Sequence, residues 1–383
     1  MQNDAAKNIK WLNTFFLFLI AIAKVVRYTI MYESLVVPGK GFKFIADMAI
    51  HSHDFVINIK SFNAVAQVES AAGQNTMALA EVCNVFGLTT YYEWEFFITI
   101  IFNLLLYRGI VSFYKTHSVS NIEVLFIYLN IIILNIFSFC LSKEILQMIF
   151  WFIIMLSFKG QTSQKKCLIR VCFAILLTIL FTRKYYGLVL GYFMLVYIWQ
   201  DKFLSNAKMS NFKIIISSLC MLSIMAGVYY IMSSYLAIEA EESYEELERV
   251  MSKERGTRAG IASVIKPIFG GGSIAINTLE YFFKIIRLMF PLELLLQFKI
   301  SYLITIFFQG FIFFIMLTVF KKRKNYTLEM TIATALYIAF WLTSAAFEPD
   351  FGSWIRHQSV VFPVILYMLG KKNQSKTKYL IIN

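Results

Sequence analysis

Two carboxylates, an arginine and a histidine lie within ten residues near the end of the chain: Glu348, Asp350, Arg356 and His357. Apolar runs at 327–346 and 358–370 enclose this polar segment. Pro349 blocks helix continuation and Gly352 permits a sharp turn, so we expect a re-entrant loop or a tight hairpin over 347–357. These side chains suit proton transfer from a hydroxyl and stabilisation of an anionic leaving group. We therefore expect the segment to form one wall of an active site.

Two further polar segments carry basic residues beside predicted spans. Lys143 and Glu144 open one apolar run, where a lysine at a helix N-terminus makes a site for phosphate. Helix capping and a favourable charge explain the same residues equally well. Arg183, Lys184 and Tyr186 lie between two short runs. They are either interfacial anchors or part of a pyrophosphate site.

The amino-acid composition indicates that the apolar segments face lipid rather than water. Of 383 residues, 58% are hydrophobic, 17% aromatic and only 15% charged. A soluble domain averages roughly 45–50% apolar and 25% charged residues. Long, continuous apolar runs predict transmembrane helices rather than a barrel, whose strands alternate. The net charge of +13 lies in the connecting segments, so we interpret it as a topology signal rather than a nucleic-acid surface.

We expect an all-α polytopic membrane protein with about ten transmembrane helices, similar in kind to GT-C enzymes. The predicted spans are roughly 11–30, 95–112, 119–140, 145–158, 167–182, 186–200, 214–237, 301–320, 327–346 and 358–370. With the N-terminus inside, the short cytoplasmic segments hold about nineteen Lys and Arg residues against four outside. Both termini are then cytoplasmic.

We treat 1–383 as a single membrane domain with two long extracytoplasmic segments, 31–94 and 238–300. In the second segment a helix should begin at Asn277, a good N-cap with Glu280 three residues later. Glu280, Lys284 and Arg287 fall on one line of this otherwise apolar helix, which ends at Pro291. This pattern is typical of an amphipathic helix lying in the membrane interface.

The outer face holds no nucleotide sugars, so an activated sugar must arrive there on a lipid carrier. A lipid-pyrophosphate glycan fits the residue set. Arg183, Lys184 and Arg356, together with Lys143, would stabilise the departing diphosphate, and Asp350 or Glu348 would take the proton of the attacking hydroxyl. We predict no cofactor and no metal, although Glu348 and Asp350 have the spacing of a divalent-ion site. The predicted substrate-binding residues are Arg183, Lys184, Tyr186, Lys143, Glu144, Trp354, His357 and Arg287.

This arrangement resembles the Wzy-type repeat-unit polymerases of capsule, exopolysaccharide and O-antigen assembly, and the EpsG-like membrane proteins. The resemblance rests on the ten or so spans, Leu141–Glu144, Arg183–Gly187, the outer segment ending in Leu288–Leu294, and 347–357. It implies transfer of a growing undecaprenyl-pyrophosphate-linked glycan onto the next lipid-linked repeat unit, with Arg183 and Arg356 as the outward-facing arginines. The implied partners are that substrate, membrane lipids, and the chain-length regulator and flippase of the same pathway.

Two other functions fit the same sequence. A GT-C-type glycosyltransferase using a polyprenyl-phosphate sugar would place a catalytic acid in the first outer segment, at Asp47 or Asp54. A lipid-linked oligosaccharide flippase or transporter would place charges deep within its spans, whereas most charges here lie at span ends.

Overall fold

The structure is a computed structural model that describes the helical body of the chain. The described residues are 11, 15, 101, 103–111, 113–114, 120–138, 143–156, 163–181, 185–204, 210–239, 264–269, 274–297, 300–321, 327–348 and 350–369. This part is helical, and its one β-type pairing is an isolated antiparallel bridge between Val264 and Asp350. The all-α prediction is confirmed for these residues. Most of 11–30, all of 31–94 and most of 238–273 lie outside them.

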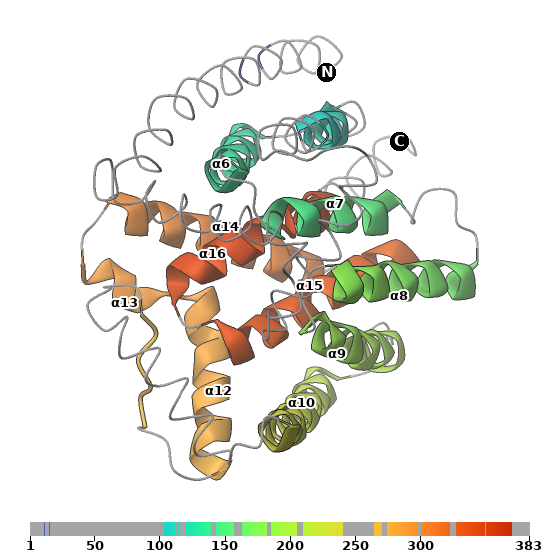
Figure 1. Cartoon of the computed structure of the whole chain (residues 1–383), viewed down its shortest axis with the longest axis vertical. Helices are drawn as coiled ribbons and strands as arrows, with labels where there is room; N and C mark the ends of the chain where they lie inside the picture. Colours follow the sequence, from blue (N-terminus) through green and yellow to red (C-terminus); the bar gives the residue numbers. More distant parts are fainter. Residues whose placement is uncertain are drawn as a thin grey trace, which may run out of the picture. The chain divides into compact units, whose positions relative to one another are not determined.

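The chain divides into two compact units, and the first comprises Met1–Gly187 and Ser359–Asn383. Its described helices are α6 (Asn121–Ser138), α7 (Lys143–Leu156) and α8 (Gln164–Phe181). α6 begins with a capping box: the Glu123 carboxylate accepts the Ser120 backbone N–H at 2.8 Å, and the Glu123 N–H donates back to the Ser120 hydroxyl. α7 packs along α8 and also contacts α6 (Figure 1).

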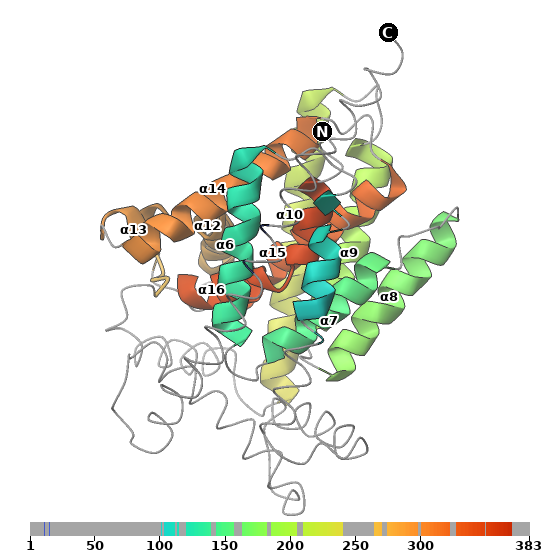
Figure 2. The ribbon, with the colours of Figure 1, turned by 90° about the horizontal axis from the view of Figure 1, so that it is seen from above.

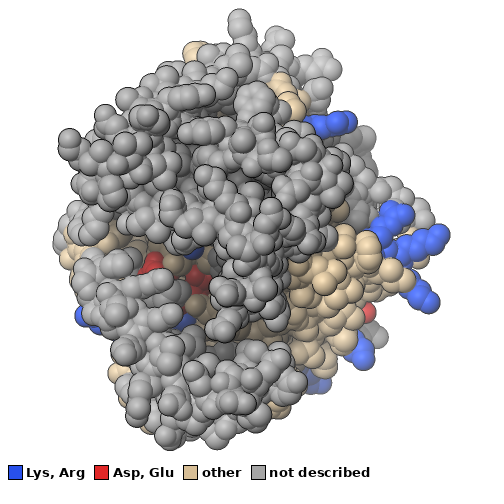
Figure 3. Space-filling model, in the orientation of Figure 1, with Lys and Arg blue, Asp and Glu red and all other residues tan. Residues whose placement is uncertain are grey.

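Basic residues lie at the start of α8, where Lys165, Lys166 and Arg170 occupy its first two turns. Most of the Lys and Arg side chains visible in Figure 3 gather at the right-hand edge, where Figure 1 places α8. Beyond these turns the helix is apolar.

The second unit, Leu188–Gln358, contains an antiparallel helical hairpin. α9 (Tyr186–Trp199) passes into a short π-helix, η3 (Gln200–Leu204), and α10 (Asn211–Glu239) returns beside α9 (Figure 2). The Tyr192 hydroxyl donates to the Met225 carbonyl at 2.9 Å, and the Trp199 indole N–H donates to the Ser217 hydroxyl at 3.1 Å. These two bonds fix the register of the hairpin.

The rest of the second unit contains one helix that is almost fully buried. The elements are α12 (Ile274–Met289), α13 (Leu292–Leu295), α14 (Ile300–Lys321), α15 (Leu328–Phe347) and α16 (Phe351–Ser359). α15 is buried on nearly every side: 83% of the residues in its most apolar stretch are buried, compared with 33% for α14. Tyr281 and Trp341 join α12 to α15 by donating to the carbonyls of Leu342 and Ile285, respectively.

Two helices in the described part are long and apolar enough to cross a membrane, Tyr302–Lys321 and Leu328–Phe347. The predicted apolar runs from 119–140 to 327–346 correspond to the observed helices α6, α7, α8, α9, α10, α14 and α15, with ends that differ by no more than a few residues. Helix positions were therefore predictable from the sequence. Membrane crossing by helices other than these two stays a prediction.

Two local predictions were wrong. The segment 347–357 is not a re-entrant loop or a tight hairpin over its length, because Phe351–Ser359 form helix α16. The helix predicted to start at the N-cap Asn277 begins at Ile274 instead, so Asn277 lies inside α12. At the first place Asp350 caps a new helix where a turn was expected. At the second, the residues before Asn277 continue the helix, so the capping preference of Asn277 is overridden.

Candidate active site

The candidate site begins where α15 ends. Glu348 is the C-cap of α15, with extended backbone angles of φ −73° and ψ 120°. A residue that precedes proline is disfavoured in the helical region, so Pro349 in the sequence explains why the helix stops here. The Glu348 N–H still donates to the Ser344 carbonyl at 2.8 Å. The turn therefore leaves the Glu348 side chain beside the following helix.

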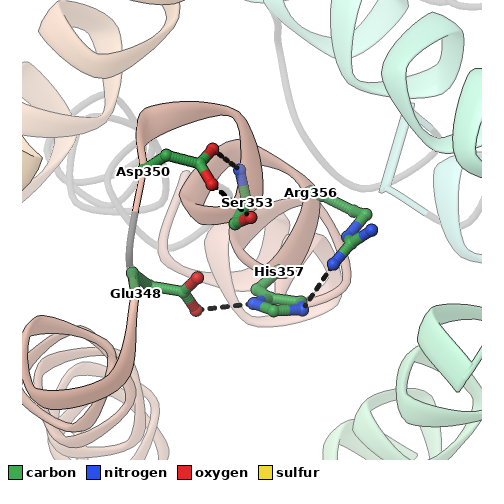
Figure 4. A network of polar contacts seen from close by, with 5 residues as sticks. All are labelled: Glu348, Asp350, Ser353, Arg356 and His357. Atoms are coloured by element: carbon green, nitrogen blue, oxygen red, sulfur yellow. Dashed lines mark hydrogen bonds and ion pairs between the residues drawn. The ribbon is translucent and has the colours of Figure 1, made fainter. Parts of the chain in front are cut away.

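Asp350 is the N-cap of α16. Its Oδ1 accepts the Ser353 backbone N–H at 2.8 Å, and its Oδ2 accepts the Ser353 hydroxyl at 3.0 Å (Figure 4). Its carbonyl accepts the Trp354 N–H at 3.1 Å, which closes the first turn. A Cβ on Gly352 would lie 3.1 Å from Oδ1, so the small residue leaves room for the cap. Both carboxylate oxygens thus bond within the first turn of α16.

Glu348 meets His357 rather than a cation from another helix. The Glu348 Oε1 lies 2.5 Å from the His357 Nδ1, and the two residues are only 3% and 4% exposed. On the other side of the ring, the half-buried Arg356 places Nη2 3.5 Å from the His357 Nε2 (Figure 4). A guanidinium has only donors, so we assign Nε2 as the acceptor and Nδ1 as the protonated nitrogen.

This order of groups has a chemical consequence. A carboxylate that accepts the Nδ1–H of a histidine fixes the ring orientation and the tautomer, and it leaves Nε2 as a base. The contact between Arg356 and Nε2 is at the long limit of a hydrogen bond and is easily exchanged. The cluster Glu348–His357–Arg356 therefore combines an oriented proton acceptor with a neighbouring fixed positive charge.

The two carboxylates of the segment serve different partners. Glu348 bonds to an imidazole, whereas Asp350 bonds to a backbone amide and a hydroxyl. Among the described residues, no group of three or more His, Cys, Asp and Glu side chains is placed to hold a metal ion. The sequence also places His51, His53 and Asp54 close together, as a metal site would need, but these residues lie outside the described part of the chain.

A buried chain of hydrogen bonds holds the C-terminal turn of α16. The Gln358 Nε2 donates to the Tyr337 hydroxyl at 2.7 Å, and the Gln358 and Gln309 amides bond to each other. All three residues are 0% exposed and come from α16, α15 and α14. This network was not predicted from the sequence. Gln309, a single glutamine within the apolar run of α14, was a usable signal, because a buried amide needs a partner.

Trp354 belongs to the core of the second unit. It is 0% exposed, its indole N–H donates to the Leu288 carbonyl at 2.9 Å, and its ring stacks on Phe340 at 6.0 Å between centroids. The residue was predicted to bind substrate, but its ring packs against other protein side chains. Its position anchors α16 to α12 and α15, and so indirectly places His357.

Arg287 was predicted to bind substrate, but its guanidinium is engaged by protein groups. Its Nε and Nη2 donate to the two carboxylate oxygens of Glu293 at 3.0 and 2.6 Å, and Nη1 donates to the Lys266 carbonyl at 2.7 Å. The bidentate pair closes the turn between α12 and α13. The Phe269 N–H also donates to the Glu280 carboxylate. These bonds tie residues 264–269 to α12.

The remaining candidates lie in the first unit. Tyr186 is 1% exposed, stacks on Tyr185 at 5.0 Å and approaches the Trp151 ring at 6.2 Å. Lys143 and Glu144 lie in the first turn of α7, but their side chains are outside the described set. Arg183 and Lys184 also fall outside it. The predicted convergence of Arg183 with the 347–357 segment therefore stays a prediction.

Comparison with known proteins adds no assignment, because no family model, no curated protein and no solved structure matches the chain.

Proposed function

We propose that the chain is a polytopic membrane protein. Support comes from apolar side chains on the outward faces of helices. Ile169, Phe173, Leu176 and Leu180 form a continuous stripe on α8, and each is 46–63% exposed. Leu303, Phe307, Phe314 and Leu317 form a similar stripe on α14. Water-soluble monomers rarely expose contiguous apolar surface of this kind, whereas lipid requires it.

The polarity of the interior supports the same conclusion. Glu348, His357, Gln309 and Gln358 are each less than 5% exposed, while the outward stripes are aliphatic and aromatic. Ionisable groups within a membrane domain face the protein interior or a cavity, and they mark functional sites. We therefore take the Glu348–His357–Arg356 cluster as the candidate catalytic centre.

We propose that this centre polymerises oligosaccharide repeat units carried on undecaprenyl pyrophosphate, at the outer face of a bacterial cytoplasmic membrane. The observation that carries the proposal is the geometry of the cluster, in which His357 is held in one tautomer by Glu348 beside the Arg356 guanidinium. A hydroxyl acceptor needs a base, and a diphosphate leaving group needs a cation. The cluster supplies both, and a phosphate leaving group needs no separate acid.

The reaction step follows from these roles. A sugar hydroxyl of the acceptor repeat unit attacks the anomeric carbon of the donor glycan, and the bond from that carbon to the diphosphate oxygen breaks. The hydroxyl proton passes to the His357 Nε2, and the bond pair leaves with undecaprenyl pyrophosphate. Arg356 moves its donors from Nε2 to the departing diphosphate, which frees Nε2 for the proton. Glu348 stabilises the imidazolium that forms.

This assignment refines the roles expected from the sequence. Either Glu348 or Asp350 was expected to be the base. The capping bonds of Asp350 favour a structural role for it, and the contact of Glu348 with Nδ1 favours a positioning role. His357 thereby becomes the proton acceptor that we propose.

The test uses polymer length in cells that depend on this chain. We expect Arg356→Ala and His357→Gln to insert normally but to stop chain growth, so that single repeat units accumulate on the lipid carrier. Glu348→Gln should fail in the same way, because an amide can donate to Nδ1 and invert the tautomer. Arg170→Ala, which removes an exposed arginine of α8, is the matched control. Normal-length polymer in Arg356→Ala would remove this cluster from the reaction.

A further inference from the structure

A groove of about 500 Å³ runs between α9 and α10 in the second unit. Its walls are formed by Leu195, Ile198, Trp199, Ile216, Cys220 and Ile224. Ile198, Ile216 and Ile224 are 44–56% exposed, so the groove opens to the side of the helical hairpin rather than into the core. Its volume is in the range of pockets that hold small molecules, and its walls are almost entirely apolar.

The length of the groove matches one leaflet of a membrane. It extends along α10 from Lys213 to Ile224. Eleven residues of α-helix at a rise of about 1.5 Å per residue span about 16 Å. Half of a typical hydrocarbon core of about 30 Å is about 15 Å. A single acyl chain of one leaflet therefore fits along the groove, with its polar end beside Lys213.

The polar end of the groove is basic. Lys213 lines the groove itself, and Lys202 is exposed on η3 at the same end of the hairpin. Asp201 shares η3, and the connecting sequence adds Lys208, so basic residues outnumber acidic ones at this end. Within the described residues, neither Lys202 nor Lys213 forms an ion pair. An anionic headgroup complements this end, whereas a neutral one gains nothing from it.

We infer that the groove binds one acyl chain of an anionic glycerophospholipid, with its phosphate held by Lys213 and Lys202. The inference rests on the proposed membrane location. In the predicted orientation this end of the hairpin is cytoplasmic, whereas the 347–357 segment is on the outer side. The occupant is therefore an inner-leaflet phospholipid and not the glycan-carrying lipid, so the groove is a second lipid site apart from the proposed reaction.

The experiment titrates the purified full chain with phosphatidylglycerol that carries brominated acyl chains and measures the quenching of tryptophan fluorescence. Brominated phosphatidylcholine, which has no net charge, is titrated in the same way for comparison. Trp199 lines the groove, so Trp199→Phe should remove the quenching that saturates at low lipid. We expect Lys213→Glu to weaken phosphatidylglycerol binding about 25-fold, since each charge near a lipid surface contributes about fivefold. Lys165→Glu on α8 is the matched control and should bind normally.

A second perturbation fills the groove without changing charge. Cys220 lines it and is exposed, so the bulky substitution Cys220→Phe, which adds no tryptophan, should abolish saturable quenching while Cys220→Ala retains it. Equal binding of the two lipids by the unaltered chain would overturn the inference. So would equal effects of Lys213→Glu and Lys165→Glu, or full binding by a folded Cys220→Phe. Recovery of the chain without detergent would instead refute the membrane location itself, and polymer length tests the reaction separately.

Discussion

Replacing Asp350 by asparagine separates a catalytic carboxylate from a helix cap. Asparagine caps helices as well as aspartate does, because its side-chain oxygen accepts the same backbone N–H. In Asp350→Asn the amide oxygen takes the place of Oδ1, which accepts the Ser353 N–H at 2.8 Å. We therefore expect Asp350→Asn to keep normal polymer length and a free energy of unfolding within about 0.5 kcal/mol of the unaltered chain.

The alanine variant sets the scale of the capping effect. Asp350→Ala removes the cap, which costs about 1 kcal/mol, and also the 3.0 Å bond from the Ser353 hydroxyl, which contributes about 1 kcal/mol more. The expected loss is about 2 kcal/mol of unfolding free energy. If Asp350 were the base, removing its charge would instead lower the rate by about 10²–10⁴-fold in both variants.

The assay compares three variants at equal amounts in membranes. Chain length of the polymer is read on gels, and resistance to thermal unfolding is measured on the detergent-purified chain. We expect His357→Gln to lose chain growth with little change in unfolding, and Asp350→Asn to lose neither. An Asp350→Asn chain that unfolds normally but makes no polymer would refute the assignment of the base to His357.

Two further predictions concern the groups that place the cluster. Gln358→Leu should lower the free energy of unfolding by about 1–2 kcal/mol, because Gln309 and Tyr337 lose buried hydrogen-bond partners. The double variant with Gln309→Leu should recover part of that loss. A double-mutant cycle that shows no coupling between Gln358 and Gln309 would contradict the network. Arg287→Lys should lower the free energy of unfolding by about 1 kcal/mol, because lysine cannot form the bidentate pair with Glu293 that closes the α12–α13 turn. If this variant lost polymer formation without losing stability, Arg287 would instead be a substrate-binding residue.

The helices were predictable because their signals are local. An apolar run of about 20 residues favours a helix wherever it lies, and Thr327 before α15 is a usual N-cap whose hydroxyl accepts the Met330 N–H. The polar segment 347–357 was likewise visible from composition alone. Its conformation was mispredicted because Gly352 suggested a turn, whereas Asp350 caps a helix that tolerates glycine in its first turn.

The sequence by itself determined which segments are apolar helices, and it showed that two carboxylates, an arginine and a histidine lie close together at 348–357. Only the tertiary structure decided which carboxylate meets His357, because that depends on the rotation of α16 relative to the extended Glu348. It also decided that Gln309 and Gln358, 49 residues apart, share a buried bond. The order of apolar residues along the chain is enough to predict a helix. A hydrogen bond between side chains of separate helices depends on the direction in which those side chains point, and only the packing of the helices sets that direction.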